Sequence, residues 1–214
     1  IYGVNDGLGA VFGIVSGVAG ATGGNANYVL ISGLAGMMAS ALSMGSGAYL
    51  ATKSEREVYE AEMQREKKEI DESPDEERIE MELFYQLKGF TPDEAKKLVD
   101  RLSASPDQFL KLMAHEELGL SEGQFPSPWT SAFSATISTA LGAFIPIIPF
   151  FFTSGYPAII ASLIISTLAH FAVGAAKCLV TIRPWWATGL EMTGVGLLEA
   201  VVTYGLGLLF KAAV

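Results

Sequence analysis

The sequence predicts an all-α, polytopic membrane protein with five transmembrane helices and a charged helical insert between the second and the third. Half of the 214 residues are hydrophobic and 23 are glycine. The charged residues are segregated, since only six of them lie outside Lys53–Glu122: Asp6, Lys177, Arg183, Glu191, Glu199 and Lys211. The remaining segments are long enough to cross a hydrocarbon core of about 30 Å. We therefore expect three parts, residues 1–53, 54–126 and 127–214.

The first two spans precede the insert. Ile1–Thr22 is apolar and carries Asp6 as its only charge. Small residues recur in it every four positions, which lets another helix backbone approach closely, either within one protomer or between subunits: Gly9, Gly13 and Gly17. After a glycine turn, Tyr28–Leu50 forms the second span. A chain that opens on isoleucine rather than methionine is expected to lack its native start.

The insert is predicted to be a bundle of helices. No glycine or proline lies between Gly47 and Pro74, so the second span should continue out of the membrane as one helix. Three shorter helices follow, each opened by a proline in its first turn: from Pro74 to about Leu87, from Pro92 to about Leu102, and from Pro106 to near Leu118. Thr91 and Glu94 have the spacing of a capping box.

The last three spans follow the insert. They are Trp129–Thr153, Pro157–Val180 and Trp185 to about Phe210. Pro146 and Pro149 should kink the first of them, with the freed carbonyls satisfied by neighbours or water. We expect His170 to form an interhelical hydrogen bond. The single cysteine, Cys178, excludes an intrachain disulfide.

The charge distribution predicts orientation and partners. Eleven of the 14 Lys and Arg residues lie in the insert, counting Lys53, and Lys177 and Arg183 follow the fourth span. The positive-inside rule therefore places the insert in the cytoplasm. The net charge of −9 is concentrated in the insert, which excludes a nucleic-acid footprint and indicates cations as partners, beside the lipid bilayer.

The candidate cation ligands of the insert are mainly carboxylates. Glu66 and Glu69 lie three residues apart, and Glu77 and Glu80 repeat this spacing after Pro74. Two antiparallel helices joined by a tight turn can direct all four at one space, where cations would relieve their repulsion. The alternative is a solvated acidic face. Met113 and Glu117, four apart on a later helix, favour a transition-metal site because a thioether suits such ions better than Mg²⁺ or Ca²⁺.

The transmembrane segments carry three further candidate residues. A carboxylate in a membrane helix costs roughly 2.5 to 3.5 kcal/mol, so Asp6 is expected to bind a cation or a proton. The alternative is a residue near the helix start that forms a hydrogen bond in the interface. Glu191 and Glu199 lie eight residues apart in the fifth span and are expected to face the protein interior. They are candidate proton sites, Glu199 more so because it lies deeper; the alternative is an interfacial Glu191 and a hydrogen-bonded Glu199.

Several stretches, taken together, resemble one family. They are Asn5-Asp6-Gly7-Leu8, Ser43-Met44-Gly45, Gly47-Ala48-Tyr49-Leu50-Ala51, Glu66 to Pro74 with the Glu-x-x-Glu after it, Glu117-Leu118-Gly119-Leu120, and Gly142 to Pro149. In their order and their placement around the insert, they resemble the vacuolar iron transporter family, and the resemblance covers nearly the whole chain.

The resemblance implies a homodimer, formed through the first transmembrane helix, that moves Fe²⁺ or Mn²⁺ out of the cytosol in exchange for protons. It implies a vacuolar or a bacterial inner membrane, no resident cofactor and no enzymatic activity. The metal-collecting residues would be Glu66, Glu69, Glu77, Glu80, Met113 and Glu117. The translocation path would use Asp6 and Met44. One departure is Gly36, where the family pattern has a carboxylate; Glu199 or Glu191 is the expected substitute.

Two other functions fit the same residues. A membrane-anchored metal sensor or buffer would bind metal without moving it. A di-iron oxidase would use the paired carboxylates, but the insert contains only His115 and no Glu-x-x-His motif.

Overall fold

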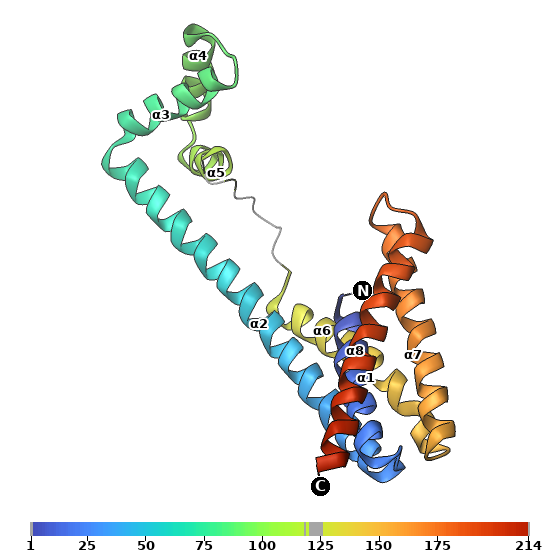
Figure 1. Ribbon diagram of the computed structural model, residues 1–214. Helices are drawn as coiled ribbons and strands as arrows, with labels where there is room; N and C mark the ends of the chain where they lie inside the picture. The colour runs from blue at the N-terminus through green and yellow to red at the C-terminus, as the bar shows by residue number, and fades with distance from the viewer. Residues whose placement is uncertain (1, 118, 120–125, 214) are drawn as a thin grey trace. The chain divides into compact units, whose positions relative to one another are not determined.

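A computed structural model describes residues 2–117, 119 and 126–213, and their regular secondary structure is entirely helical (Figure 1). Within these residues, five helices are long and apolar enough to cross a membrane: α1 (Tyr2–Thr22), α2 (Ala26–Glu72), α6 with η1 (Pro128–Phe151), α7 with η2 (Tyr156–Leu179) and α8 (Trp185–Ala213). The predicted fold class is confirmed. The chain divides into two compact units, residues 1–49 with 129–214, and residues 50–128.

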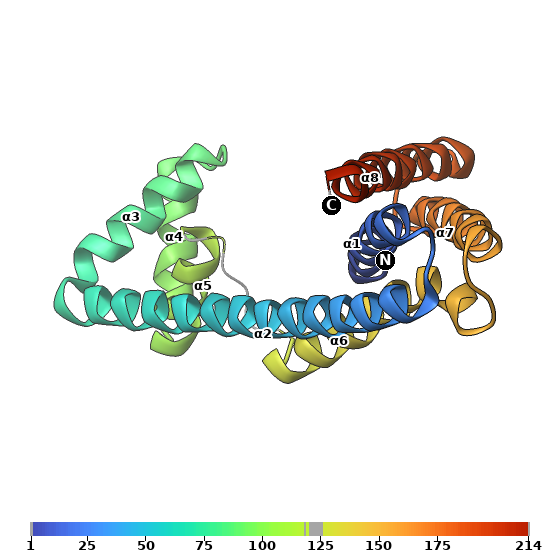
Figure 2. The same cartoon turned by 60° about the horizontal axis from the view of Figure 1, so that its bottom comes forward.

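In the first unit, α1, α7 and α8 lie side by side (Figure 2). The glycine stripe of α1 faces α8: a Cβ added at Gly17 would lie 3.3 Å from the carbonyl oxygen of Thr203, and one at Gly20 only 2.5 Å from that of Tyr204. On α8, a Cβ added at Gly207 would lie 2.0 Å from the carbonyl oxygen of Gly17. Of the two alternatives for this stripe, packing within one protomer is the one that the structure shows.

The other side of α1 contributes to the apolar core of this unit. Val11, Val15 and Ala19 of α1 are buried there. They pack with residues of α2, α6, η1 and α7, namely Val29, Ala143, Ile147, Phe150 and Ala158. The helix α1 thus packs on two sides: its glycines face α8, and its apolar side chains contact the core.

The two prolines of the third span change the type of helix. The α-helix α6 (Pro128–Phe144) ends just before Pro146 and continues as the 3₁₀-helix η1 (Ile145–Phe151). Proline lacks the N–H that an α-helix needs at this position. The hydroxyl of Ser162 on α7 donates a 2.7 Å hydrogen bond to the carbonyl of Pro146. A neighbouring helix thus supplies the donor, as the sequence predicted.

The second unit contains the C-terminal part of α2, from Leu50 on, and three shorter helices: α3 (Pro74–Leu87), α4 (Pro92–Leu102) and α5 (Pro106–Glu116). The helix α2 runs without interruption to Glu72, as expected. The predicted capping box at Thr91 and Glu94 is present, and Gly89 ends the preceding helix with φ +100°. The core consists of Met81, Tyr85, Ala95, Val99, Phe109 and Met113. The predicted end of the last helix at Leu118 lies outside the described residues.

Candidate metal centre

Three carboxylates from three helices of the second unit converge. They belong to Glu66 of α2, Glu77 of α3 and Glu117, the C-terminal cap of α5. Their ligand oxygens all lie within 4.8 Å of one another. The turn at Ser73 and Pro74 lies between the first two. The N–H of Ser73 donates to the carbonyl of Glu69 at the end of α2, and the carbonyl of Ser73 accepts from the N–H groups of Glu76 and Glu77 in the first turn of α3.

Glu66 is the most constrained of the three. Its side chain is 0% exposed, and apart from the facing carboxyl group of Glu117 neither of its carboxylate oxygens has a hydrogen-bond partner among the described residues. Burial raises its pKa from 4.5 to about 7, and the negative charges of Glu117, Glu77, Glu69 and Glu80 add to this. An unpartnered buried carboxylate is costly, so this group favours a ligand or a proton.

Glu77 and Glu117 share this environment. Burial raises the pKa of each, and the charges of Glu80 and Glu69 raise both further. Ionised carboxylates can only accept hydrogen bonds, so Glu66 and Glu117 can bond to each other only when one is protonated. A divalent cation can replace that proton. Metal–oxygen bonds of about 2.0–2.6 Å hold two ligand oxygens at most roughly 5 Å apart, which is compatible with this cluster.

The other predicted insert residues lie around the cluster. Glu69 and Glu80 are exposed, and Glu69 is 3.9 Å from Arg65. Their negative charges raise the pKa values of Glu66 and Glu117 in the cluster. Met113 is fully buried in the core of the unit, one turn before Glu117, whose N–H donates to the Met113 carbonyl at 2.9 Å. Arg65 was missed by the sequence reasoning, although its position between Glu62 and Glu69 was visible.

In the first unit, Asp6 lies against α2. Its carboxylate is exposed and accepts a 3.4 Å hydrogen bond from the hydroxyl of Ser40. Met44 is half-buried and lies one turn after Ser40 on the same face of α2. The sequence reasoning missed Ser40, although its spacing of four from Met44 was a usable signal. Gly36 is partly exposed and faces α1, where a Cβ would lie 2.5 Å from Cδ1 of Ile14.

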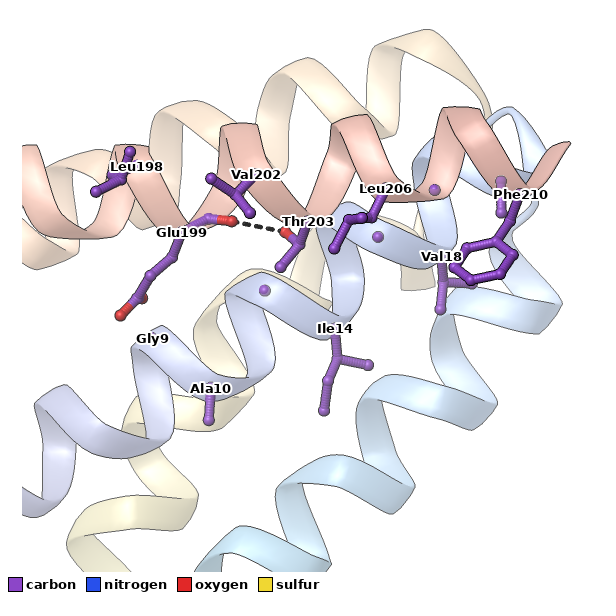
Figure 3. Close-up of a pocket in the computed structure, with 14 residues that line it drawn as sticks. Gly9, Ala10, Ile14, Val18, Leu198, Glu199, Val202, Thr203, Leu206 and Phe210 are labelled. Carbon is purple, nitrogen blue, oxygen red and sulfur yellow. Dashed lines mark hydrogen bonds between the residues drawn. The ribbon is translucent and has the colours of Figure 1, made fainter. Parts of the chain in front are cut away.

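Glu191 and Glu199, which the sequence analysis expected to face the interior, are both exposed in the single chain, and both contribute to the lining of a small cavity beside α8. Glu191 is near the start of α8 and forms a 2.6 Å ion pair with Arg183. Glu199 extends from α8 toward Gly9 of α1, where a Cβ would lie 2.7 Å from its Oε2 (Figure 3). It reaches the rim of a groove of about 920 Å³ between α1 and α8.

Comparison with known proteins gives one consistent result. A model of the VIT family matches residues 1–208. Vacuolar iron transporter 1 of Eucalyptus grandis is 34% identical over 207 residues, which cover 96% of this chain and 83% of that protein. Vacuolar iron transporter 1 of Arabidopsis thaliana is 38% identical, over 83% of this chain and 71% of its own length. Protein CCC1 of Saccharomyces cerevisiae is 28% identical over 92% of this chain.

The two plant relatives are named as transporters rather than enzymes, which agrees with the predicted absence of enzymatic activity. The family match extends over both compact units and all five apolar helices. The chain therefore belongs to the VIT family.

Proposed function

We propose that this protein carries Fe²⁺, and Mn²⁺ as an alternative substrate, out of the cytosol in exchange for protons. The names of its relatives support iron as the substrate. The observation that carries the proposal is the buried, unpartnered carboxylate of Glu66 beside Glu77 and Glu117. Such a cluster is repulsive when empty and is relieved by a divalent cation.

In this proposal the insert lies in the cytoplasm and collects metal for the membrane unit. Glu66, Glu77 and Glu117 bind the ion directly. Glu69 and Glu80, which are exposed nearby, attract cations and extend the site. Met113 contributes a soft thioether after a rotation of its side chain, which would favour Fe²⁺ over Mg²⁺.

The proposed membrane path passes Asp6 and Met44. An ionised Asp6 binds the cation, with Ser40 and Met44 of α2 on the facing side. A protonated Asp6 has no charge and releases the cation. One carboxylate can therefore exchange metal for a proton, which is the elementary step of an antiporter.

A homodimer is the assembly that the groove between α1 and α8 supports. Glu199 is exposed at the groove, although its neighbours there are apolar residues such as Ile14 and Val202 (Figure 3). A carboxylate facing lipid at this depth costs roughly 2.5 to 3.5 kcal/mol on insertion scales. A second copy seated on the groove would shield Glu199 from lipid, and α1 would then contribute to the subunit interface.

The proposal is tested with purified protein in lipid vesicles that contain a pH-sensitive dye. Wild-type protein should take up Fe²⁺ with a proton counterflow. Asp6→Asn should abolish the flux, because asparagine cannot ionise, while metal binding by the insert stays intact. Binding without flux would indicate a buffer or sensor instead, and oxygen consumption on adding Fe²⁺ would indicate an oxidase.

A further inference from the structure

A small polar cavity lies between α1, α7 and α8, apart from the path at Asp6. Its volume is about 110 Å³, which is room for a few water molecules. Asn5, His170, Glu191, Met192 and Glu199 contribute to its lining. Polar side chains around a cavity inside an apolar helix bundle are expensive and indicate a function.

His170 presents one ring nitrogen without a partner. The side chain is 2% exposed, and its Nδ1 lies 2.8 Å from the backbone carbonyl of Ser166. A carbonyl can only accept, so Nδ1 carries the hydrogen and the neutral ring has its lone pair on Nε2. No described residue forms a hydrogen bond with Nε2. The hydrogen bond of His170 is therefore within α7 rather than interhelical as the sequence predicted, and Nε2 presents its lone pair to the cavity.

Two glycines make room for the polar groups. A Cβ at Gly196 of α8 would lie 2.6 Å from Nε2 of His170, so only glycine lets the ring sit against this helix. Gly9 of α1 plays the same part for the carboxylate of Glu199. Glu199 lines both the cavity and the α1–α8 groove, and its carboxylate extends toward Gly9, which also lines both (Figure 3).

The other charged groups near the cavity are engaged elsewhere. Glu191 is paired with Arg183 at 2.6 Å. On α1, Asp6 faces Ser40 of α2, and Asn5 and Phe12 do not titrate. Among the described residues that line the cavity, His170 and Glu199 are thus the titratable groups without an opposite charge beside them.

We propose that His170 and Glu199 form a second proton-binding site in each protomer, which passes protons between the groove and the cavity. One proton is shared: it resides on a Glu199 oxygen beside neutral His170, or transfers through water to Nε2 and leaves an imidazolium beside a carboxylate. Both forms are neutral overall, and loss of the proton leaves a net charge of −1. A neutral pair can carry a proton at membrane depth without the cost of an isolated charge.

This inference deepens the proposed proton exchange and rests on it for its role in transport. The flux test uses His170→Gln and Glu199→Gln in the same vesicles. Each should bind metal at the insert as the wild type does, because neither residue lies in that unit. Each should lose most of the acceleration by a pH gradient, about five-fold or more, and the double variant should be no worse because the two residues act as one unit.

Ser166→Ala is the matched control, because it alters a buried side chain one turn from His170 and keeps the carbonyl that holds the ring. It should retain coupling. Full coupling in both glutamine variants would overturn the inference while leaving the proposed function standing. Absence of iron flux in the wild type would instead count against the proposed function.

Protonation of His170 can be observed without any transport. The chain has two histidines, so a His115→Gln protein labelled with ¹⁵N-histidine gives one imidazole signal. The proton of the neutral ring should be on Nδ1, which faces the carbonyl of Ser166. The signal of Nε2 should change on Glu199→Gln, because both groups line the same cavity. A ring protonated at Nε2, or an Nε2 signal that does not change on Glu199→Gln, would refute the proton site.

Discussion

The pKa of one residue, Glu66, makes the stability of the insert depend on pH. Its pKa is about 7 in the folded state against an ordinary value of 4.5, so the folded state binds the proton more tightly. Its contribution to stability is fully present below pH 4.5 and is lost as the pH rises through 7. The difference corresponds to about 3 kcal/mol. Without metal, the helical signal of the full-length protein in detergent should melt about 5–10 °C lower at pH 8 than at pH 5.

Two comparisons make this test specific. Glu66→Gln cannot ionise, so its melting temperature should vary much less with pH. Adding Mn²⁺ at pH 8 should restore the melting temperature of the wild type and leave that of the variant unchanged. Equal pH profiles of the two proteins would show that Glu66 is not a buried, unpartnered carboxylate in solution.

The same residue predicts that metal binding releases protons. At pH 7 about half of Glu66 is protonated, and a metal ion must displace that proton to bind the carboxylate. Calorimetry in buffers of different ionisation enthalpy should show about 0.5 proton released from Glu66 at pH 7, to which Glu77 and Glu117 add because their pKa values are raised too, and fewer protons at pH 8.5. Proton release that does not change with pH would contradict the raised pKa. Glu55→Gln, exposed on α2, is the control and should release as many protons as the wild type.

At the scale of elements, glycines set how closely the transmembrane helices approach. A Cβ at Gly142 of α6 would lie 1.9 Å from the backbone carbonyl of Val4 on α1, which cannot move aside without its helix. Gly142→Ala should therefore separate α1 from α6 and destabilise the protein by about 1–3 kcal/mol, seen as a lower melting temperature in detergent. Gly194→Ala on α8 is the control: a Cβ added there would have no atom within 4 Å apart from the neighbouring residues and backbone of its own helix, so alanine should be neutral or slightly stabilising.

The helices and their ends were readable from the sequence because their signals are local. Pro74, Gly89 and the pair Thr91 and Glu94 fix helix ends through backbone geometry and short-range hydrogen bonds. The sequence did not predict which helix packs on the glycine stripe. Gly9 and Gly17 allow a close approach by any helix and do not determine which one it is. The choice of α8 depends on Gly207 and Thr203, which are almost 200 residues away.

The candidate metal centre was predictable in part for the same reason. Glu66 and Glu77 follow from the spacing and the turn at Pro74, which are local. The sequence did not predict that Glu66 and Glu77 converge while Glu69 and Glu80 stay exposed. This depends on the position of α5, because Glu117 at its end completes the cluster. The exposure of Glu199 also escaped prediction, since residues eight apart in a helix lie about 80° apart around it and its neighbours decide which side is covered.

At the scale of the whole molecule, the groove between α1 and α8 predicts where two copies meet. In a two-fold dimer, residues near the symmetry axis approach their own copies. With Cys178 replaced by serine, the chain has no other cysteine, so Ala10→Cys, exposed in the groove, should form a covalent dimer under mild oxidation in native membranes. Leu168→Cys, 64% exposed on α7 and outside the groove, should remain monomeric on a non-reducing gel. If Leu168→Cys crosslinks while Ala10→Cys does not, the subunits meet on another face, and Glu199 must be shielded by lipid headgroups, water or protonation rather than by a partner.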